Sequence, residues 1–340
     1  MRVGTALVVA LTRSVAAWRA VVLVYLANLG LALVPATLLH GAIAASLGSS
    51  LAGERMRTGF DPHWYNSFSA QATGVAATFG PSVAGRGAIF DALEAFVGGF
   101  AGLLADPASG LVPLVAAYFL LWSFVSAGFI ARFSDAAEPR GFMASASRHF
   151  PAVLLITVIG LVFFVAMLGP VRSWLDGLRM AALKEELDER VLFAWSVAQE
   201  TATWTAIFVA RVVLDYAKVG AVRRSTGSLL RRILGALGLA VRLAWRHPLR
   251  IGGLHAGLGI ISVATLVTYV LVVPGTGTAS GSAVLWTFLL GQLYILSRVF
   301  LRVSFLAGAT ALSCSLDEVD EEPPATHSAG PSHHKPPTES

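Results

Sequence analysis

Six long apolar segments constrain the fold of this 340-residue chain more than any other feature of its sequence. Each is about 20 residues or longer, which is the length that an α-helix needs to cross the hydrocarbon core of a bilayer. A mean hydropathy of +0.69 and only 13% charged residues exclude an ordinary soluble domain. The sequence therefore predicts an all-α integral membrane protein, with transmembrane helices at about residues 20–47, 111–133, 152–171, 192–222, 251–273 and 283–312.

The distribution of basic residues predicts the orientation of these spans. Residues 211–250 hold nine of the 25 Lys and Arg residues but only one acid, Asp215, and such connectors stay on the cytoplasmic side of a membrane. The connector 134–150 and both termini are then cytoplasmic as well. The connectors on the outside are 48–109, 172–190 and 274–282. All but three of the basic residues are arginine, which favours a GC-rich bacterial source, so we expect the protein in a bacterial inner membrane.

Residues 224–250 are expected to form an amphipathic helix on the cytoplasmic side. At about 100° per residue, six arginines share one side of this helix and the apolar residues share the other. Such a helix can lie in the headgroup layer and bind anionic lipid. Two alternatives remain open, since these arginines also enforce topology or dock a protein. The six are Arg224, Arg231, Arg232, Arg242, Arg246 and Arg250, opposite Leu229, Leu230, Ile233, Leu234, Leu237, Ala240, Val241 and Ala244.

Charged residues within the fourth and sixth spans form a second candidate site. Arg211, Asp215 and Lys218 lie on one helical face, and Gln292, Arg298 and Arg302 follow each other along the sixth span. Intramembrane charges cost several kcal/mol unless they are paired or hydrated, so we expect an ion-pair cluster that joins the two spans. It can fix helix register, hold an anionic headgroup or solute, or carry ions or protons.

The remaining segments predict a membrane domain over residues 1–314 and a disordered acidic, Pro- and His-containing tail over 315–340. Within the outer loop, residues 88–104 are apolar but too short for a span, so we expect an interfacial helix there. The first apolar segment is too long for a signal peptide and is expected to remain uncleaved. The two basic connectors end alike, at Arg148-His149 and Arg246-His247, which suggests a weak internal repeat.

No catalytic motif, cofactor site or metal site is recognisable in the sequence. The positive charge lies in connectors between apolar segments, so it does not indicate binding to nucleic acid. The leading interpretation is a non-enzymatic membrane protein that organises or senses anionic lipid, or supports a membrane complex as a protein partner or homo-oligomer. The alternative is a small-solute or lipid transporter with a polar site between the fourth and sixth spans. A membrane-embedded enzyme comes third.

A family resemblance rests on Arg211, the run Asp215 to Lys218, Arg246-His247-Pro248, and Gln292 with Arg298 and Arg302. Together these resemble uncharacterised multi-span bacterial inner-membrane proteins. They are also similar to the membrane domain that precedes the catalytic barrel in some glycerophosphodiester phosphodiesterases. The resemblance implies a membrane module near phospholipid metabolism or envelope assembly. It implies no phosphodiesterase activity, because no barrel follows the spans in this chain.

Overall fold

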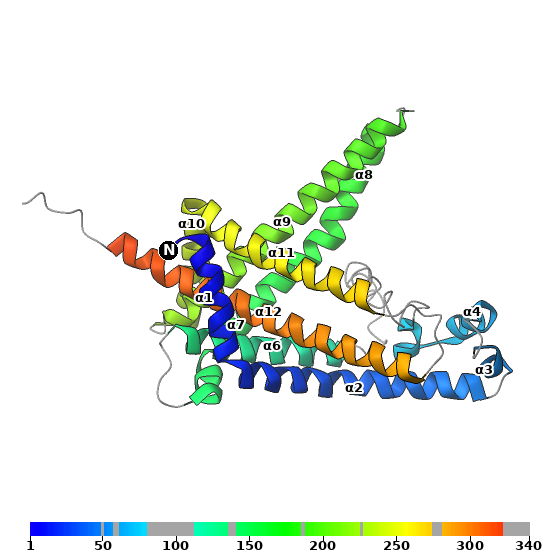
Figure 1. The fold of residues 1–340 in the computed structure, drawn as a ribbon. Coiled ribbons are helices and arrows are strands. Elements are labelled where there is room, and N and C mark those ends of the chain that lie inside the picture. Colours follow the sequence, from blue (N-terminus) through cyan, green and yellow to red (C-terminus); the bar gives the residue numbers. More distant parts are fainter. Residues whose placement is uncertain are drawn as a thin grey trace, which may run out of the picture.

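The computed structural model describes residues 1–48, 51–56, 61–79, 112–134, 141–184, 188–224, 227–273 and 281–321. These residues form helices and no strand, which confirms the all-α class. The predicted interfacial helix 88–104 lies outside the described residues, and so does most of the predicted tail. Figure 1 shows α2, α6, α11 and α12 running side by side, while α8 and α9 form a hairpin that extends away from them.

Five helical stretches are long and apolar enough to cross a membrane. They lie in α2 (Trp18–Gly48), α6 (Val112–Phe133), α7 (Gly141–Ala166) with its continuation, α11 (Pro248–Val272) and α12 (Gly281–Glu321). These five match five of the six predicted spans and support a multi-pass membrane protein. The orientation of the chain across the membrane stays a prediction.

The predicted fourth span, 192–222, lies in α9 (Glu189–Arg223), which is not one of these five stretches. Its 35 residues extend about 52 Å, well beyond the roughly 30 Å of a hydrocarbon core. The helix also carries charged residues along its length, including Glu200, Arg211, Asp215 and Lys218. Length and composition therefore support five spans, and α9 as a sixth span remains a prediction.

The third predicted span begins earlier and continues further than the sequence indicated. Residues of the connector 134–150 already belong to α7, which passes through Pro151 without interruption. A π-helical turn, Met167–Val171, then joins α7 to α8 (Arg172–Ala182). Proline lacks an amide hydrogen and often accompanies such irregular turns, and Pro170 lies within this one. α7 packs on both α6 and α9, whereas α8 packs on α9 in the hairpin that extends away from the other helices, so the turn lies where the helix leaves the bundle.

The second basic connector behaves differently from the first. Here α10 (Leu229–Arg246) ends before His247, and α11 starts at Pro248, a residue that suits the first turn of a helix. The predicted helix 224–250 is therefore too long at both ends. Arg224 follows the end of α9 and Arg250 lies in the first turn of α11. Because only the second connector has this break, the two connectors do not have the same local structure.

The first residues, which precede the predicted span 20–47, also form a helix. α1 (Val3–Ala16) packs on α11 and α12. An added Cβ at Gly253 or Gly257 of α11 would lie 3.2 Å from Val3 or 2.9 Å from Leu7, so both glycines permit close approach. Arg13 of α1 donates a 2.8 Å hydrogen bond to the carbonyl of Phe133, where α6 ends.

The core lies where α6, α7, α9, α11 and α12 meet. Its largest fully buried side chains include Phe129, Ile130, Ile156, Ile251, Leu254, Leu258, Leu312 and Leu316. At the far end of α2, a separate cluster forms around α3 (Ala52–Arg55), α4 (Pro62–Gln71) and the 3₁₀ turn Gly74–Thr78. α12 continues to Glu321, past the predicted start of the tail at residue 315.

Candidate functional site

α10 presents three different faces around its axis. One face is buried against α9, one is apolar and exposed, and one is basic. The exposed apolar stripe spans only about 60° of the helix at about 100° per residue. Its members are Leu230 (68% exposed), Leu234 (60%), Val241 (54%) and Trp245 (87%). Arg231, Arg242 and Arg246 are exposed on the sector beside this stripe. The buried face consists of Ile233, Ala236, Ala240 and Leu243.

The sequence predicted one apolar face, and the structure divides it into two. Ile233 and Ala240 pack into the protein, whereas Leu230, Leu234 and Val241 remain exposed. Leu237 is partly buried against the core, and Leu229 is 41% exposed. Periodicity alone identifies apolar positions, but it cannot say which of them meet a neighbouring helix.

Arg232 differs from the exposed arginines because it is bonded within the protein. Its Nη2 donates to Nδ1 of His149 at 2.7 Å, and its Nε donates to the carbonyl oxygen of Ala221. His149 is buried in α7, so one side chain ties α10 to both α7 and α9. Burial lowers the pKa of Arg232, and the positive charge of Arg148 adds to the effect. Arg232 therefore has a structural role and does not belong with the lipid-facing arginines.

Three helices bring ionisable side chains together in what we call the inner cluster: Arg211, Asp215 and Lys218 of α9, His255 of α11 and Arg302 of α12. Asp215 is buried, and its Oδ1 lies 3.4 Å from Nζ of Lys218. Its Oδ2 lies 3.9 Å from Nε2 of His255. The guanidinium of Arg211 lies over the ring of Phe305 at 5.8 Å, and His255 approaches the same ring at 5.5 Å.

His255 was not identified from the sequence. It is buried, and Nδ1 lies 3.2 Å from the carbonyl oxygen of Ile251. Because a carbonyl only accepts, Nδ1 carries the proton in this contact and Nε2 faces Asp215. A lone histidine in an apolar segment gives no sequence signal of its own. Only the packing of α11 on α9 reveals its place beside the carboxylate.

The polar residues of α12 reach different partners from those predicted. Arg302 donates to the Tyr118 hydroxyl at 2.8 Å, and its guanidinium lies 3.8 Å from the centroid of the Trp122 ring. Both partners belong to α6. Gln292 accepts from Tyr25 of α2 at 2.7 Å, and Arg298 is exposed beside Tyr294 of its own helix. The predicted set therefore divides: Arg302 stays near Asp215 and Lys218, whereas Gln292 and Arg298 lie elsewhere.

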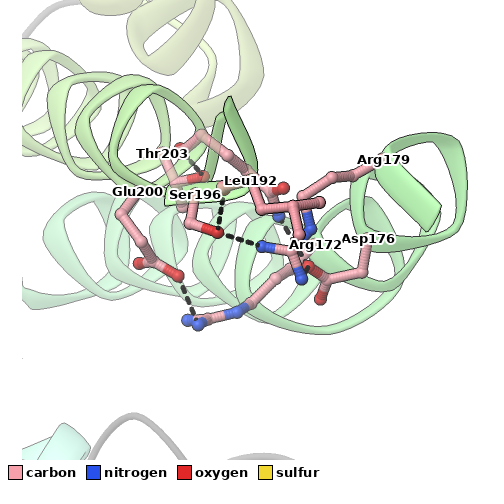
Figure 2. A network of polar contacts seen from close by, with 8 residues as sticks. Arg172, Asp176, Arg179, Leu192, Ser196, Glu200 and Thr203 are labelled. Carbon is pink, nitrogen blue, oxygen red and sulfur yellow. Dashed lines mark hydrogen bonds and ion pairs between the residues drawn. The ribbon is translucent and has the colours of Figure 1, made fainter. Parts of the chain in front are cut away.

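A second polar network joins α8 to α9, as Figure 2 shows. We call it the hairpin network: Arg172, Asp176, Arg179, Ser196, Gln199 and Glu200. Its ion pairs are Arg172 with Glu200 at 2.5 Å and Arg179 with Asp176 at 3.4 Å. Arg179 also donates to Ser196 at 2.9 Å, and Gln199 donates to Asp176 at 2.8 Å. The network holds two arginines and two carboxylates, so its charge balances.

Other candidate groups have plain structural roles or carry no site. Asp61 caps α4 by accepting from the backbone amides of His63 and Trp64, and it pairs with Arg55 at 3.1 Å. The part of the chain that the structure describes contains no group of three metal-ligating side chains. Comparisons with protein-family models, curated proteins and solved structures gave no match for this chain.

Proposed function

We propose that this protein is a non-enzymatic inner-membrane protein that binds anionic lipid through α10 and thereby organises or senses that lipid. The observation that carries this proposal is the exposed apolar stripe of α10 beside exposed arginines. A helix of this kind lies in the interface with its apolar residues among the acyl chains and its guanidinium groups on lipid phosphates. A purely topological role for the arginines requires no such stripe.

The position of α10 in the chain agrees with this role. α10 ends at Arg246, and the apolar helix α11 starts at Pro248, so the end of α10 lies where a candidate span begins. Trp245 and Leu249 flank this junction and are 87% and 86% exposed. Tryptophan is enriched at the boundary between hydrocarbon and headgroups. The resemblance to the membrane domains of glycerophosphodiester phosphodiesterases also favours a place near phospholipids.

Native mass spectrometry of the full chain from mild detergent tests this proposal. The protein is titrated with phosphatidylglycerol or with zwitterionic phosphatidylcholine. We expect wild type to retain phosphatidylglycerol in preference. Replacing Arg231 and Arg242 by Gln removes about 1 kcal/mol per charge, so the affinity for phosphatidylglycerol should fall about 30-fold at low salt.

A charge-matched control separates the α10 surface from net charge. Arg2→Gln with Arg190→Gln removes two exposed arginines elsewhere and should leave lipid retention nearly unchanged. Trp245→Ala should weaken binding of both lipids, whereas Trp174→Ala, at a residue 63% exposed on α8, should not. Equal lipid retention by wild type and the Arg231/Arg242 variant would reduce the α10 arginines to topology signals.

A further inference from the structure

The inner cluster has more positive than negative charge. Arg211, Lys218 and Arg302 are three cations around one carboxylate, Asp215. Arg211 lies over the ring of Phe305, which is one turn from Arg302 on α12, and both arginines act on Lys218 as like charges. Asp215 offsets only one of them. His255 adds no negative charge, since an imidazole is neutral or positive.

The inner cluster also has hydrogen-bond donors that have no partner among the described residues. Arg302 has five N–H groups, and among the described residues one of them is bonded, to Tyr118. Lys218 has three, and its contact with Asp215 is long, at 3.4 Å. The hydroxyl of Tyr216 is buried beside His255 and has no hydrogen-bond partner among the described residues. The indole Nε1 of Trp122, under Arg302, is likewise unpartnered there.

These groups are already held in place before any ligand binds. The Trp122 ring and the Tyr118 hydroxyl orient the guanidinium of Arg302, and Asp215 holds the ammonium of Lys218. Lys218 and Asp215 keep side-chain exposures of only 17% and 11%. A guanidinium fork matches two oxygens of a phosphate, and an ammonium adds a point charge beside it.

We propose that the inner cluster is a binding site for a phosphate-bearing anion, with Arg302 and Lys218 as its direct ligands and Arg211 at its exposed edge. The anion is either a phospholipid headgroup or free phosphate, which share the chemistry that these side chains recognise. Asp215 positions Lys218 and limits the affinity of the site. None of these residues belongs to α10, so this proposal does not depend on the lipid-binding surface described above.

The test uses the full chain with Arg231 and Arg242 replaced by Gln, so that lipid on α10 does not obscure the result. In this background we expect phosphatidylglycerol to be retained in native mass spectra. Arg302→Gln or Lys218→Gln should reduce that retention about tenfold or more, because a charge-assisted hydrogen bond is lost. Arg179→Gln, in the balanced hairpin network, is the matched control and should reduce it less than twofold.

Two arms identify the source of the anion. Delipidated protein is heated with inorganic phosphate in one arm and with phosphatidylglycerol in the other. A rise in Tm with both ligands, or with phosphate alone, that disappears in Arg302→Gln identifies a site open to free phosphate. A rise with phosphatidylglycerol alone that disappears in the same way identifies a headgroup site. No Arg302-dependent rise in either arm overturns the proposal.

Asp215→Asn tests the same proposal if the variants that remove Arg302 or Lys218 do not fold. A purely structural ion pair predicts lower stability and no gain in binding. An anion site predicts tighter retention of phosphatidylglycerol or phosphate, about fivefold or more, because the competing carboxylate charge is gone. Retention that is unchanged or lower in folded Asp215→Asn contradicts the proposal.

Discussion

The hairpin network and the inner cluster both bring charged side chains together along α9, but they balance charge in different ways. In the hairpin network each arginine pairs with a carboxylate, Arg172 with Glu200 and Arg179 with Asp176. In the inner cluster, 15 residues further along the helix from Glu200, three cations surround Asp215 alone. The first network is half exposed, whereas Asp215 and Lys218 are mostly buried.

This difference separates two uses of charge between apolar helices. A balanced and partly hydrated pair fixes how two helices meet and contributes little to the free energy of folding. A buried group with excess charge is costly, and a bound counter-ion would lower that cost. The same helix therefore carries a network that aligns the hairpin at one end and the proposed anion site at the other.

Removing one carboxylate from each network should produce the largest contrast. Asp215→Ala leaves Lys218 buried without its ion-pair partner, which should cost about 3 kcal/mol of the free energy of unfolding. Glu200→Ala affects a pair whose side chains are 32% and 42% exposed, so the loss should stay below about 1 kcal/mol. Unfolding by SDS in mixed micelles measures both values. Equal losses would erase the distinction between the two networks.

The sequence predicted the class and most spans because length and hydropathy decide whether a helix can cross a membrane. The five apolar stretches lie within a few residues of the predicted segments at most ends. The main departures are local: α7 begins in the connector before Pro151, and α1 is a packed helix. A proline does not always end a helix, and a short basic terminus gives no signal that glycines elsewhere make room for it.

The candidate site was predicted only in part. Arg211, Asp215 and Lys218 share a face because they lie on one helix, and helical spacing suffices to see that. Arg302 and its aromatic partners Tyr118 and Trp122 depend on how α12 packs on α6, which spacing along one helix does not contain. The same limit explains why His255 was missed and why Gln292 and Arg298 were wrongly joined to Asp215 in one ion-pair cluster.

The next largest contrast in stability should be between a hydrogen-bonded and an exposed arginine of α10. Arg232→Gln removes the bonds to buried His149 and to the carbonyl of Ala221, which tie α10 to α7 and α9. We expect a loss of about 2 kcal/mol and faster hydrogen exchange throughout α10. Arg231→Gln, at the neighbouring exposed position, should change stability by less than about 0.5 kcal/mol. Slow exchange in Arg232→Gln would mean that the buried face of α10 suffices to hold the helix.

The stacking of Arg302 on Trp122 should contribute a coupling free energy that is smaller than the two effects above. A double-mutant cycle with Arg302→Met and Trp122→Leu isolates this contact from the packing that each substitution loses alone. The ring lies 3.8 Å from the guanidinium and Trp122 is buried, so we expect a coupling of about 1 kcal/mol. It should persist in high salt, because buried contacts are weakly screened. A coupling free energy near zero would show that Trp122 does not hold Arg302 in position for an anion.

The smallest effect should come from the equivalent cycle in the hairpin network, with Arg172→Met and Glu200→Gln. Both side chains are partly exposed, so we expect a coupling of about 0.5 kcal/mol at low salt. It should fall towards zero at 1 M salt, where the screening length is about 3 Å. The anionic-lipid retention of this double variant should match that of wild type, because its charges were balanced before the change. A salt-independent coupling free energy, or a loss of lipid, would show that the hairpin network shares the anion-binding function that we propose for α10 and for the inner cluster.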